Sequence, residues 1–205
     1  MKKKKNIILV CVLLIVILLI AIGYWFFANF YNKKPVEEAK ILSKIDGYNY
    51  NLYDNQTKNY KELFEELNKV LANDPVDEKQ YVELISKMFI IDFYTLDNKL
   101  TNLNIGGVDF LHSSIVSNFK EKANDTMYKY VKSNIYGDRK QQLPIVDEVT
   151  VENIEQKTFK YDDASDPKAY YVNVKWTYKK DLGYEKNKTL IFVHEDKKLS
   201  LVEMS

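Results

Sequence analysis

The sequence predicts an α+β protein, with one N-terminal transmembrane helix followed by about three helices packed on a curved four-stranded antiparallel sheet. Three observations predict it. An uncharged apolar segment occupies residues 7–28, apolar residues recur with a helical period between residues 60 and 131, and alternation of period two begins after Pro144. Because the helices precede the strands instead of alternating with them, they should cover one face of the sheet.

The N-terminal segment predicts a membrane anchor. Lys2–Lys5 precede an apolar run that exceeds the roughly 20 residues needed to span a bilayer, and the flank after it carries both charge signs. This asymmetry predicts a single-pass protein of the cell membrane, with its N-terminus in the cytoplasm and the rest outside. Tyr24, Trp25 and Tyr31 suit the aromatic belt of the interface. A cleaved signal peptide is the alternative, because Ala21 and Gly23 form a small-x-small pair, but the apolar run is longer than such peptides have.

The chain therefore divides into four expected parts. These are a basic cytoplasmic tail (1–6), a transmembrane helix (7–28), a linker with a possible short strand (29–53) and an extracytoplasmic α+β domain (54–205). The last part is long enough to bury its own core without disulfides. The chain has a single cysteine, Cys11, which lies in the apolar run, so disulfides within the outer domain are excluded and a bacterial source is favoured.

Charge balance excludes one class of partner. Without the four N-terminal lysines, 26 basic residues face 29 acidic residues, a net charge of −3. A surface that binds nucleic acid needs a basic excess, so no nucleic-acid partner is expected.

Alternation from Tyr48 to Tyr53 allows a short strand within the linker. The first helix of the domain follows, with an apolar stripe from Tyr60 to Leu71, a cap at Asp54 or Asn55 and an end at Asn73–Pro75.

The second helix begins at Asp77, a capping residue with Gln80 three positions later. Its apolar stripe widens until the segment 88–96 is apolar nearly all round, which predicts burial on more than one side.

A third helix is expected after the Gly106–Gly107 loop. Ser113 or Ser114 should cap it, its stripe should run from Val116 to Val131, and Gly137 should end it.

Four strands are expected after Pro144. Residues 149–161 alternate, residues 170–178 alternate cleanly between apolar and polar, and residues 199–204 form the last strand. The segment 190–193 is apolar on both faces and is therefore expected at the centre of the sheet.

The order of three helices and a meander over residues 54–204 resembles the cone-shaped, nuclear-transport-factor-2-like fold. With one N-terminal anchor it also resembles the inner-membrane scaffold proteins of type IV secretion and conjugation machines. The stretch Leu190–Leu201 is similar to segments of small anchored proteins of low-GC Gram-positive bacteria. The resemblance is one of topology; no motif is shared residue by residue, so it assigns no functional position.

Asp92 is the main candidate for chemistry. At about 100° per residue it falls in the middle of the apolar stripe of the second helix, where a carboxylate must be paired, hydrogen-bonded or protonated. Cone-shaped folds of the ketosteroid isomerase kind use an acidic residue in their pocket as a base, and His112 would then be the second group. The structural interpretation, which we favour, is that Asp92 caps the Gly106–Gly107 loop or pairs with a lysine, Arg139 or a tyrosine.

Other polar residues point to structure rather than chemistry. Ser113 and Ser114 are expected as helix caps, and His194 as a strand residue satisfied by a neighbour. The run 162–166 is acidic but lacks the ligand period of a calcium loop, so it is expected to be a solvated hairpin tip. No metal or cofactor site is predicted.

The sequence thus favours a non-enzymatic interaction or scaffold domain, held at the lipid bilayer and bound to protein partners, in an envelope, secretion or conjugation assembly. The alternative is an extracytoplasmic small-molecule-binding protein or enzyme that uses a cone pocket around Asp92.

Overall fold

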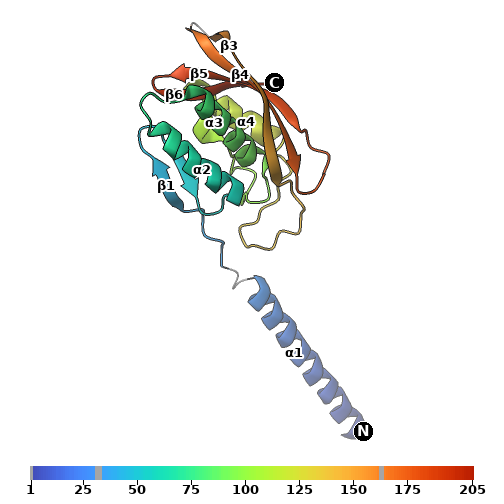
Figure 1. Cartoon of the computed structure of the whole chain (residues 1–205). Coiled ribbons are helices and arrows are strands. Elements are labelled where there is room, and N and C mark those ends of the chain that lie inside the picture. Colours follow the sequence, from blue (N-terminus) through green and yellow to red (C-terminus); the bar gives the residue numbers. More distant parts are fainter. Residues whose placement is uncertain (1, 31–33, 162–163) are drawn as a thin grey trace. The chain divides into compact units, whose positions relative to one another are not determined.

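The computed structural model describes the backbone of residues 2–30, 34–161 and 164–205 (Figure 1). Its contacts divide the chain into two units. One unit comprises the chain up to Glu37 together with Ile135–Asp138, and the other comprises Glu38–Asn134 and Arg139–Ser205.

The first unit contains helix α1 (Lys2–Phe30). Its described side chains from Val12 to Phe27 are exposed. The side chain of Cys11 and the whole of Tyr31 lie outside the described part. Among the residues that the structure describes, no helix combines the length and the apolarity needed to cross a membrane.

The second unit confirms the α+β prediction and its antiparallel meander. The strands are β3 (Val146–Tyr161), β4 (Ala164–Tyr178), β5 (Asn187–Glu195) and β6 (Lys198–Met204), paired in the order β3-β4-β5-β6. The predicted central position of 190–193 is confirmed, because β5 lies between β4 and β6 and all four residues are buried. The alternation of 170–178 is confirmed as well, since Val174 and Trp176 are buried between exposed neighbours and Val172 is buried between half-buried Tyr171 and exposed Asn173.

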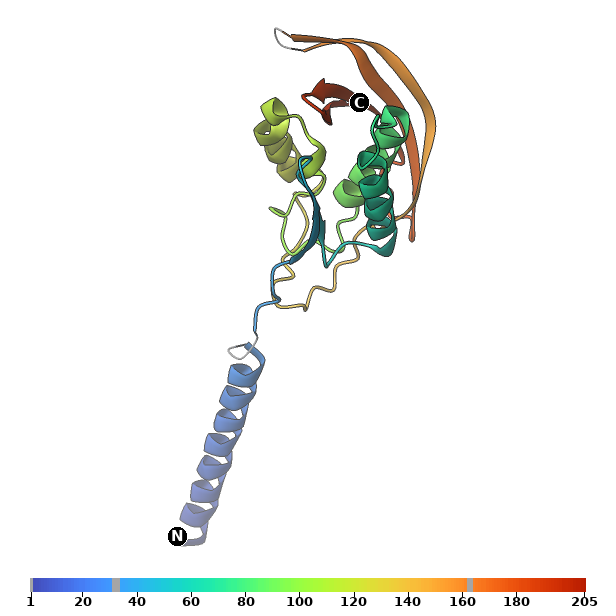
Figure 2. The same ribbon diagram turned by 60° about the vertical axis from the view of Figure 1, so that its left-hand side comes forward.

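On the concave side of this curved sheet, helix α3 (Glu78–Tyr94) packs against β3 and β4, and helix α2 (Lys58–Leu71) packs against α3 (Figure 2). Helix α2 buries the predicted stripe, but its cap differs from the prediction: Thr57, not Asp54 or Asn55, accepts a hydrogen bond from the Tyr60 amide. Helix α3 begins as predicted, with Asp77 accepting from the Gln80 amide. Its buried residues face every direction, which confirms the expected burial on more than one side.

The interior of the second unit is filled with aromatic side chains. The largest fully buried ones are Trp176, Tyr50, Tyr60, Tyr81, Tyr94, Tyr128, Phe64, Phe89, Phe110 and Phe192. Their polar ends are satisfied in part by one another: the hydroxyls of Tyr50 and Tyr81 lie 2.6 Å apart. Burial raises the pKa of Tyr81 to about 12, so these hydroxyls stay neutral and act as hydrogen-bonding groups.

The segment expected as a linker is partly folded into the domain. It forms a hairpin of β1 (Ile41–Ile45) and β2 (Tyr50–Tyr53), which belongs to the second unit. The short strand was predicted from its alternation, but its partner β1 was not. Tyr50 is fully buried and stacks on Phe110, with ring centroids 5.2 Å apart, so the hairpin is held by packing against residues distant in sequence.

The third predicted helix is much shorter than expected. Two 3-10 turns, η1 (Val108–Phe110) and η2 (Ser113–Ile115), lead into α4 (Val116–Asp125), and the chain leaves the helix there. The reason is Tyr128: its amide donates to the Ala123 carbonyl, and its buried hydroxyl donates to the Phe93 carbonyl at 2.7 Å. This hydrogen bond to α3 ends the helix, although the apolar stripe continues along the chain. Gly137 does adopt a left-handed conformation, but it ends no helix.

The predicted serine caps are also wrong. The side chain of His112 caps η2 by accepting from the Ser114 amide, and the residue that precedes α4, Ile115, makes no side-chain cap. The imidazole ring nitrogen takes the role that the serine hydroxyls were expected to have.

Candidate functional site

Asp92 is held in a closed polar network. Its Oδ1 lies 2.7 Å from the Lys99 ammonium, and its Oδ2 accepts a hydrogen bond from the Gly107 amide at 2.6 Å. The side chains are 17% exposed for Asp92 and 8% for Lys99. Both structural alternatives named from the sequence therefore occur together: the carboxylate caps the Gly106–Gly107 loop and pairs with a lysine. The side chain is less buried than the helical wheel predicts.

Two glycines make this network possible. A Cβ on Gly106 would lie 2.2 Å from the Asp92 carbonyl oxygen, and a Cβ on Gly107 would lie 2.7 Å from the Phe89 ring. Gly107 also has a φ of +75°, which L side chains rarely adopt. The Gly106 amide donates to the Tyr128 hydroxyl at 3.1 Å, so the loop is bonded to both α3 and the segment after α4.

His112 does not join Asp92. Its Nδ1 lies 2.9 Å from the Ser114 hydroxyl, and its Nε2 lies 3.7 Å from Glu195 at the end of β5. Among the described residues, no hydrogen bond or ion pair connects His112 to Asp92. Asp92 and His112, which were candidates for an acid–base pair, thus belong to two separate hydrogen-bond networks.

The order Ser114–His112–Glu195 is the order of a hydrolase triad. Its geometry does not favour that role. Both Glu195 oxygens already accept hydrogen bonds, at 2.7 Å each, from the hydroxyls of Ser113 and Ser200. Burial raises the pKa of Glu195, but these bonds and His112 outweigh it and lower the pKa below its usual value. The cluster ties η2 to β5 and β6.

His194 lies in a second carboxylate network. Beyond the point where the backbone pairing of β4 with β5 ends, the side chain of Asp166 bonds to β5 instead. Its Oδ2 accepts a hydrogen bond from the His194 amide at 2.8 Å and lies 2.7 Å from the Nδ1 of the His194 ring. Nε2 lies 3.4 Å from Glu78, which also accepts from the Tyr170 hydroxyl at 2.9 Å. The sequence predicted Asp166 in a solvated hairpin tip. The residue is buried instead, because its carboxylate bonds to β5 where the register of β4 is irregular. Residues 162–163 of that tip lie outside the described residues.

This network predicts a pH dependence of stability. Burial lowers the pKa of His194, but Asp166 and Glu78 outweigh it and raise the pKa above its usual value. A raised pKa in the folded state gives stability that is complete below the unfolded pKa of about 6.5 and is lost as pH rises through the folded pKa. We expect the thermal unfolding midpoint of the wild type to fall between about pH 6 and 8 more than that of His194→Gln.

Asp166→Asn is the matched control, because it removes the charge and keeps an oxygen for the His194 amide. It should flatten the pH dependence as His194→Gln does, and the ring protons of His194 should then titrate at a lower pH. Parallel curves for the wild type and both variants would contradict the prediction.

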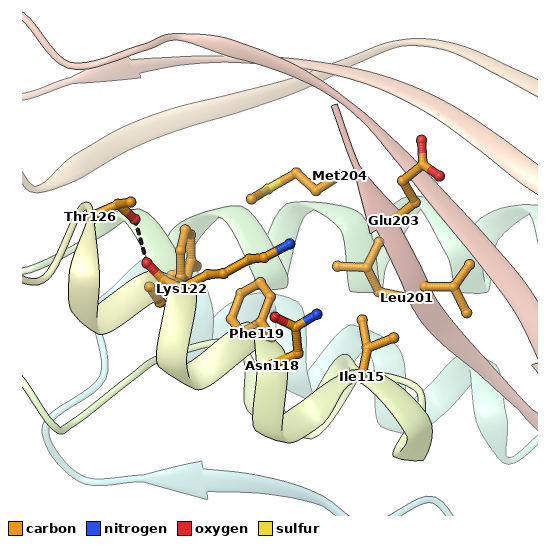
Figure 3. Close-up of a pocket in the computed structure, with 11 residues that line it drawn as sticks. Ile115, Asn118, Phe119, Lys122, Thr126, Leu201, Glu203 and Met204 are labelled. Atoms are coloured by element: carbon orange, nitrogen blue, oxygen red, sulfur yellow. Dashed lines mark hydrogen bonds between the residues drawn. The ribbon is translucent and has the colours of Figure 1, made fainter.

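The structure has a pocket of about 280 Å³ between α4 and β6 (Figure 3). It is lined by Phe93, Ile115, Asn118, Phe119, Lys122, Ala123, Thr126, Leu201, Val202, Glu203 and Met204. Neither Asp92 nor His112 is among these residues. Its apolar members are ordinary stripe and strand positions of α3, η2, α4 and β6, so no local pattern in the sequence marks the pocket.

The pocket has an apolar floor and a polar rim. Phe119, Leu201 and Met204 face the space, and Lys122 extends from α4 toward β6 (Figure 3). Beside it, the outer edge of β6 is partly open. Ser205 and Thr189 exchange both of their backbone hydrogen bonds. Because hydrogen-bonded and non-hydrogen-bonded pairs alternate along antiparallel strands, the backbone N–H and C=O of Met204 point away from β5.

Comparisons with family models, with curated proteins and with solved structures found no match for this chain. The resemblance to cone-shaped folds therefore remains a prediction. Among the side chains that the structure describes, no group of three or more His, Cys, Asp or Glu residues is arranged to hold a metal ion.

Proposed function

We propose that this chain is a single-pass membrane protein whose α+β domain lies outside the cytoplasm and binds a short extended segment of a partner protein at the pocket between α4 and β6. The anchor and its orientation rest on the sequence: four lysines precede the uncharged run of residues 7–28. The single observation that carries the binding role is the apolar pocket beside the open edge of β6.

A peptide fits these features better than a substrate does. An extended peptide could add to the open edge at Met204 by main-chain hydrogen bonds and place one apolar side chain in the pocket. Lys122 and Glu203 at the rim offer both charge signs to polar neighbours of that side chain. The volume of about 280 Å³ suits one or two side chains and lies just below the usual range for small-molecule sites.

The alternative of chemistry at Asp92 has less support. The interior that a cone pocket would occupy is filled by buried tyrosines and Trp176. The carboxylate already bonds to Lys99 and Gly107. A substrate would have to displace this ion pair before it could reach the base.

A photo-cross-linking amino acid at Asn118 tests the proposal in living cells. Asn118 is exposed at the rim of the pocket, and Thr177 is an exposed control on the opposite face of the sheet. We expect ultraviolet light to give a discrete protein adduct from position 118 that is at least about tenfold stronger than from position 177. Protease added outside intact protoplasts should degrade the adduct, since the domain is proposed to face outward.

Two results would refute the proposal. Equal labelling from both positions, or labelling of lipid alone, would contradict a protein-binding pocket. An adduct that survives protease until the cells are lysed would contradict the orientation.

A further inference from the structure

Exposed large apolar side chains of the second unit are few, and they are grouped. Among its described residues they are Ile41 (57% exposed), Leu42 (59%), Leu103 (74%) and Tyr130 (74%). Single exposed apolar residues are ordinary on protein surfaces, whereas a group at one end indicates a contact. We call these four residues the apolar end.

Hydrogen bonds place the start of β1 beside the loop that carries Leu103. The Asp54 amide donates to the Lys40 carbonyl at 3.0 Å, which fixes the residue before Ile41. The side chains of Asn55 and Asn98 each donate to the other's backbone carbonyl, at 3.3 and 3.2 Å. Ile41 and Leu42 thus lie next to the 97–104 loop.

The same loop is bonded to the segment that carries Tyr130. The Asn134 amide donates to the Leu100 carbonyl at 2.7 Å, and the side chain of Asn102 donates to that of Asn124 at 2.9 Å. In Figures 1 and 2 these loops and the start of β1 lie at one end of the unit.

Basic residues flank the apolar end. Lys129 lies over the ring of Tyr130, with its ammonium 5.6 Å from the ring centroid. Lys132 and Lys140 are exposed on the same stretch, which the Gln141 side chain joins to the Tyr130 carbonyl at 2.9 Å. Exposed leucine, tyrosine and lysine side chains together match the requirements of an anionic bilayer surface, with the rings at headgroup depth and the ammonium groups on phosphates.

Chain connectivity favours the bilayer over other partners. The chain enters the second unit at this end, and only ten residues, 31–40, lie between Phe30, where α1 ends, and Ile41. Even when fully extended, the eleven Cα–Cα steps from Phe30 to Ile41 span at most about 40 Å. Because α1 carries the apolar run, the chain ties this end of the domain to within that distance of the proposed anchor.

We propose that the apolar end binds the surface of the bilayer that holds the anchor, with Leu103 and Tyr130 at headgroup depth, so that the domain stands with one face on the membrane. This rests on the proposed function, because it needs the chain to be anchored. It also adds to it: the contact fixes the height and tilt at which the pocket between α4 and β6 is presented.

Spin labels on the full chain in phosphatidylglycerol-containing vesicles test the proposal. In a Cys11→Ala background, labels are attached to Leu103→Cys, to Tyr130→Cys and to the control Thr177→Cys, and flotation first establishes that the protein is on the vesicles. We expect the labels at 103 and 130 to collide at least about threefold less with an aqueous nickel chelate than the label at 177, and more with oxygen.

Three other outcomes would overturn the proposal, and each identifies which part of it is wrong. Labels at 103 and 130 that are as accessible to nickel as the control, in protein that floats, refute the bilayer contact and leave the anchor intact. Low nickel accessibility with spin–spin broadening indicates contact with a second copy instead of lipid. Protein that does not float refutes the anchor itself, and with it this proposal.

Discussion

Replacing Asp92 with leucine should lower the free energy of unfolding by about 3–5 kcal/mol, the cost of removing one partner from a buried ion pair. The reason is Lys99, whose side chain is only 8% exposed and whose ammonium would lose the carboxylate 2.7 Å away. The Gly107 amide would lose its acceptor as well. Asp92→Asn keeps an oxygen for that amide and should cost less, about 1–3 kcal/mol. Urea titration of the full chain in detergent, followed by tryptophan fluorescence, measures both.

Two variants serve as controls. Asp181 makes nearly the same contacts, with the Lys186 ammonium at 2.6 Å and the Gly183 amide at 2.9 Å, but in an exposed loop. Asp181→Leu should therefore leave the unfolding curve nearly unchanged, because exposed ion pairs add little. The double variant Asp92→Leu with Lys99→Met removes both charges and should recover most of the loss. If Asp92→Leu instead raised the unfolding midpoint, the carboxylate would be kept at a cost to stability, as functional groups are, and chemistry at Asp92 would be favoured.

Gly106→Ala should be the most damaging single-methyl substitution in this loop, at about 3 kcal/mol or more. The new Cβ would lie 2.2 Å from the Asp92 carbonyl oxygen and 2.7 Å from its carbon, and both atoms belong to the backbone of a fully packed helix. The loop must move, and its hydrogen bonds to Tyr128 and Asp92 move with it. The same urea titration, together with near-ultraviolet circular dichroism of the aromatic interior, measures the loss.

Gly183→Ala is the matched control. Gly183 has a φ of +79° and nothing within 4 Å of an added Cβ, so the substitution carries only the backbone strain, about 1–2 kcal/mol. If the two alanine variants were equally destabilised, the close approach of the loop to α3 would not be the reason for Gly106.

The two networks around Asp92 and His112 show what the candidate pair does. One joins α3 to the loop at 99–107, and the other joins η2 to the ends of β5 and β6. Between them they hold the segment that leads into α4, and α4 forms one side of the pocket. The two candidates for chemistry thus belong to networks that hold one side of the proposed binding site in place.

The proposed bilayer contact and the proposed peptide site are independent features of one domain. The apolar end comprises loops and the start of β1, whereas the pocket lies between α4 and β6. Cross-linking at Asn118 and spin labelling at Leu103 can therefore succeed or fail separately.

Local pattern in the sequence was enough to predict the sheet and two helices. Alternation at 170–178 predicts β4, because a strand's side chains alternate between faces whatever surrounds it. The continuous apolar run at 190–193 predicts central β5, because a central strand is buried on both faces. The Asp77 cap of α3 was predictable for the same reason: a capping hydrogen bond involves residues three positions apart.

Only the tertiary structure decided the end of α4, the partner of β2 and the location of the pocket. The apolar stripe continues past Asp125, yet the chain turns away because the Tyr128 hydroxyl bonds to Phe93, 35 residues earlier. The Asp92 carboxylate was predictable as a residue needing a partner, but Lys99 and Gly107 were two choices among many. Such contacts depend on which surfaces meet after the chain folds, and a local period contains no information about them.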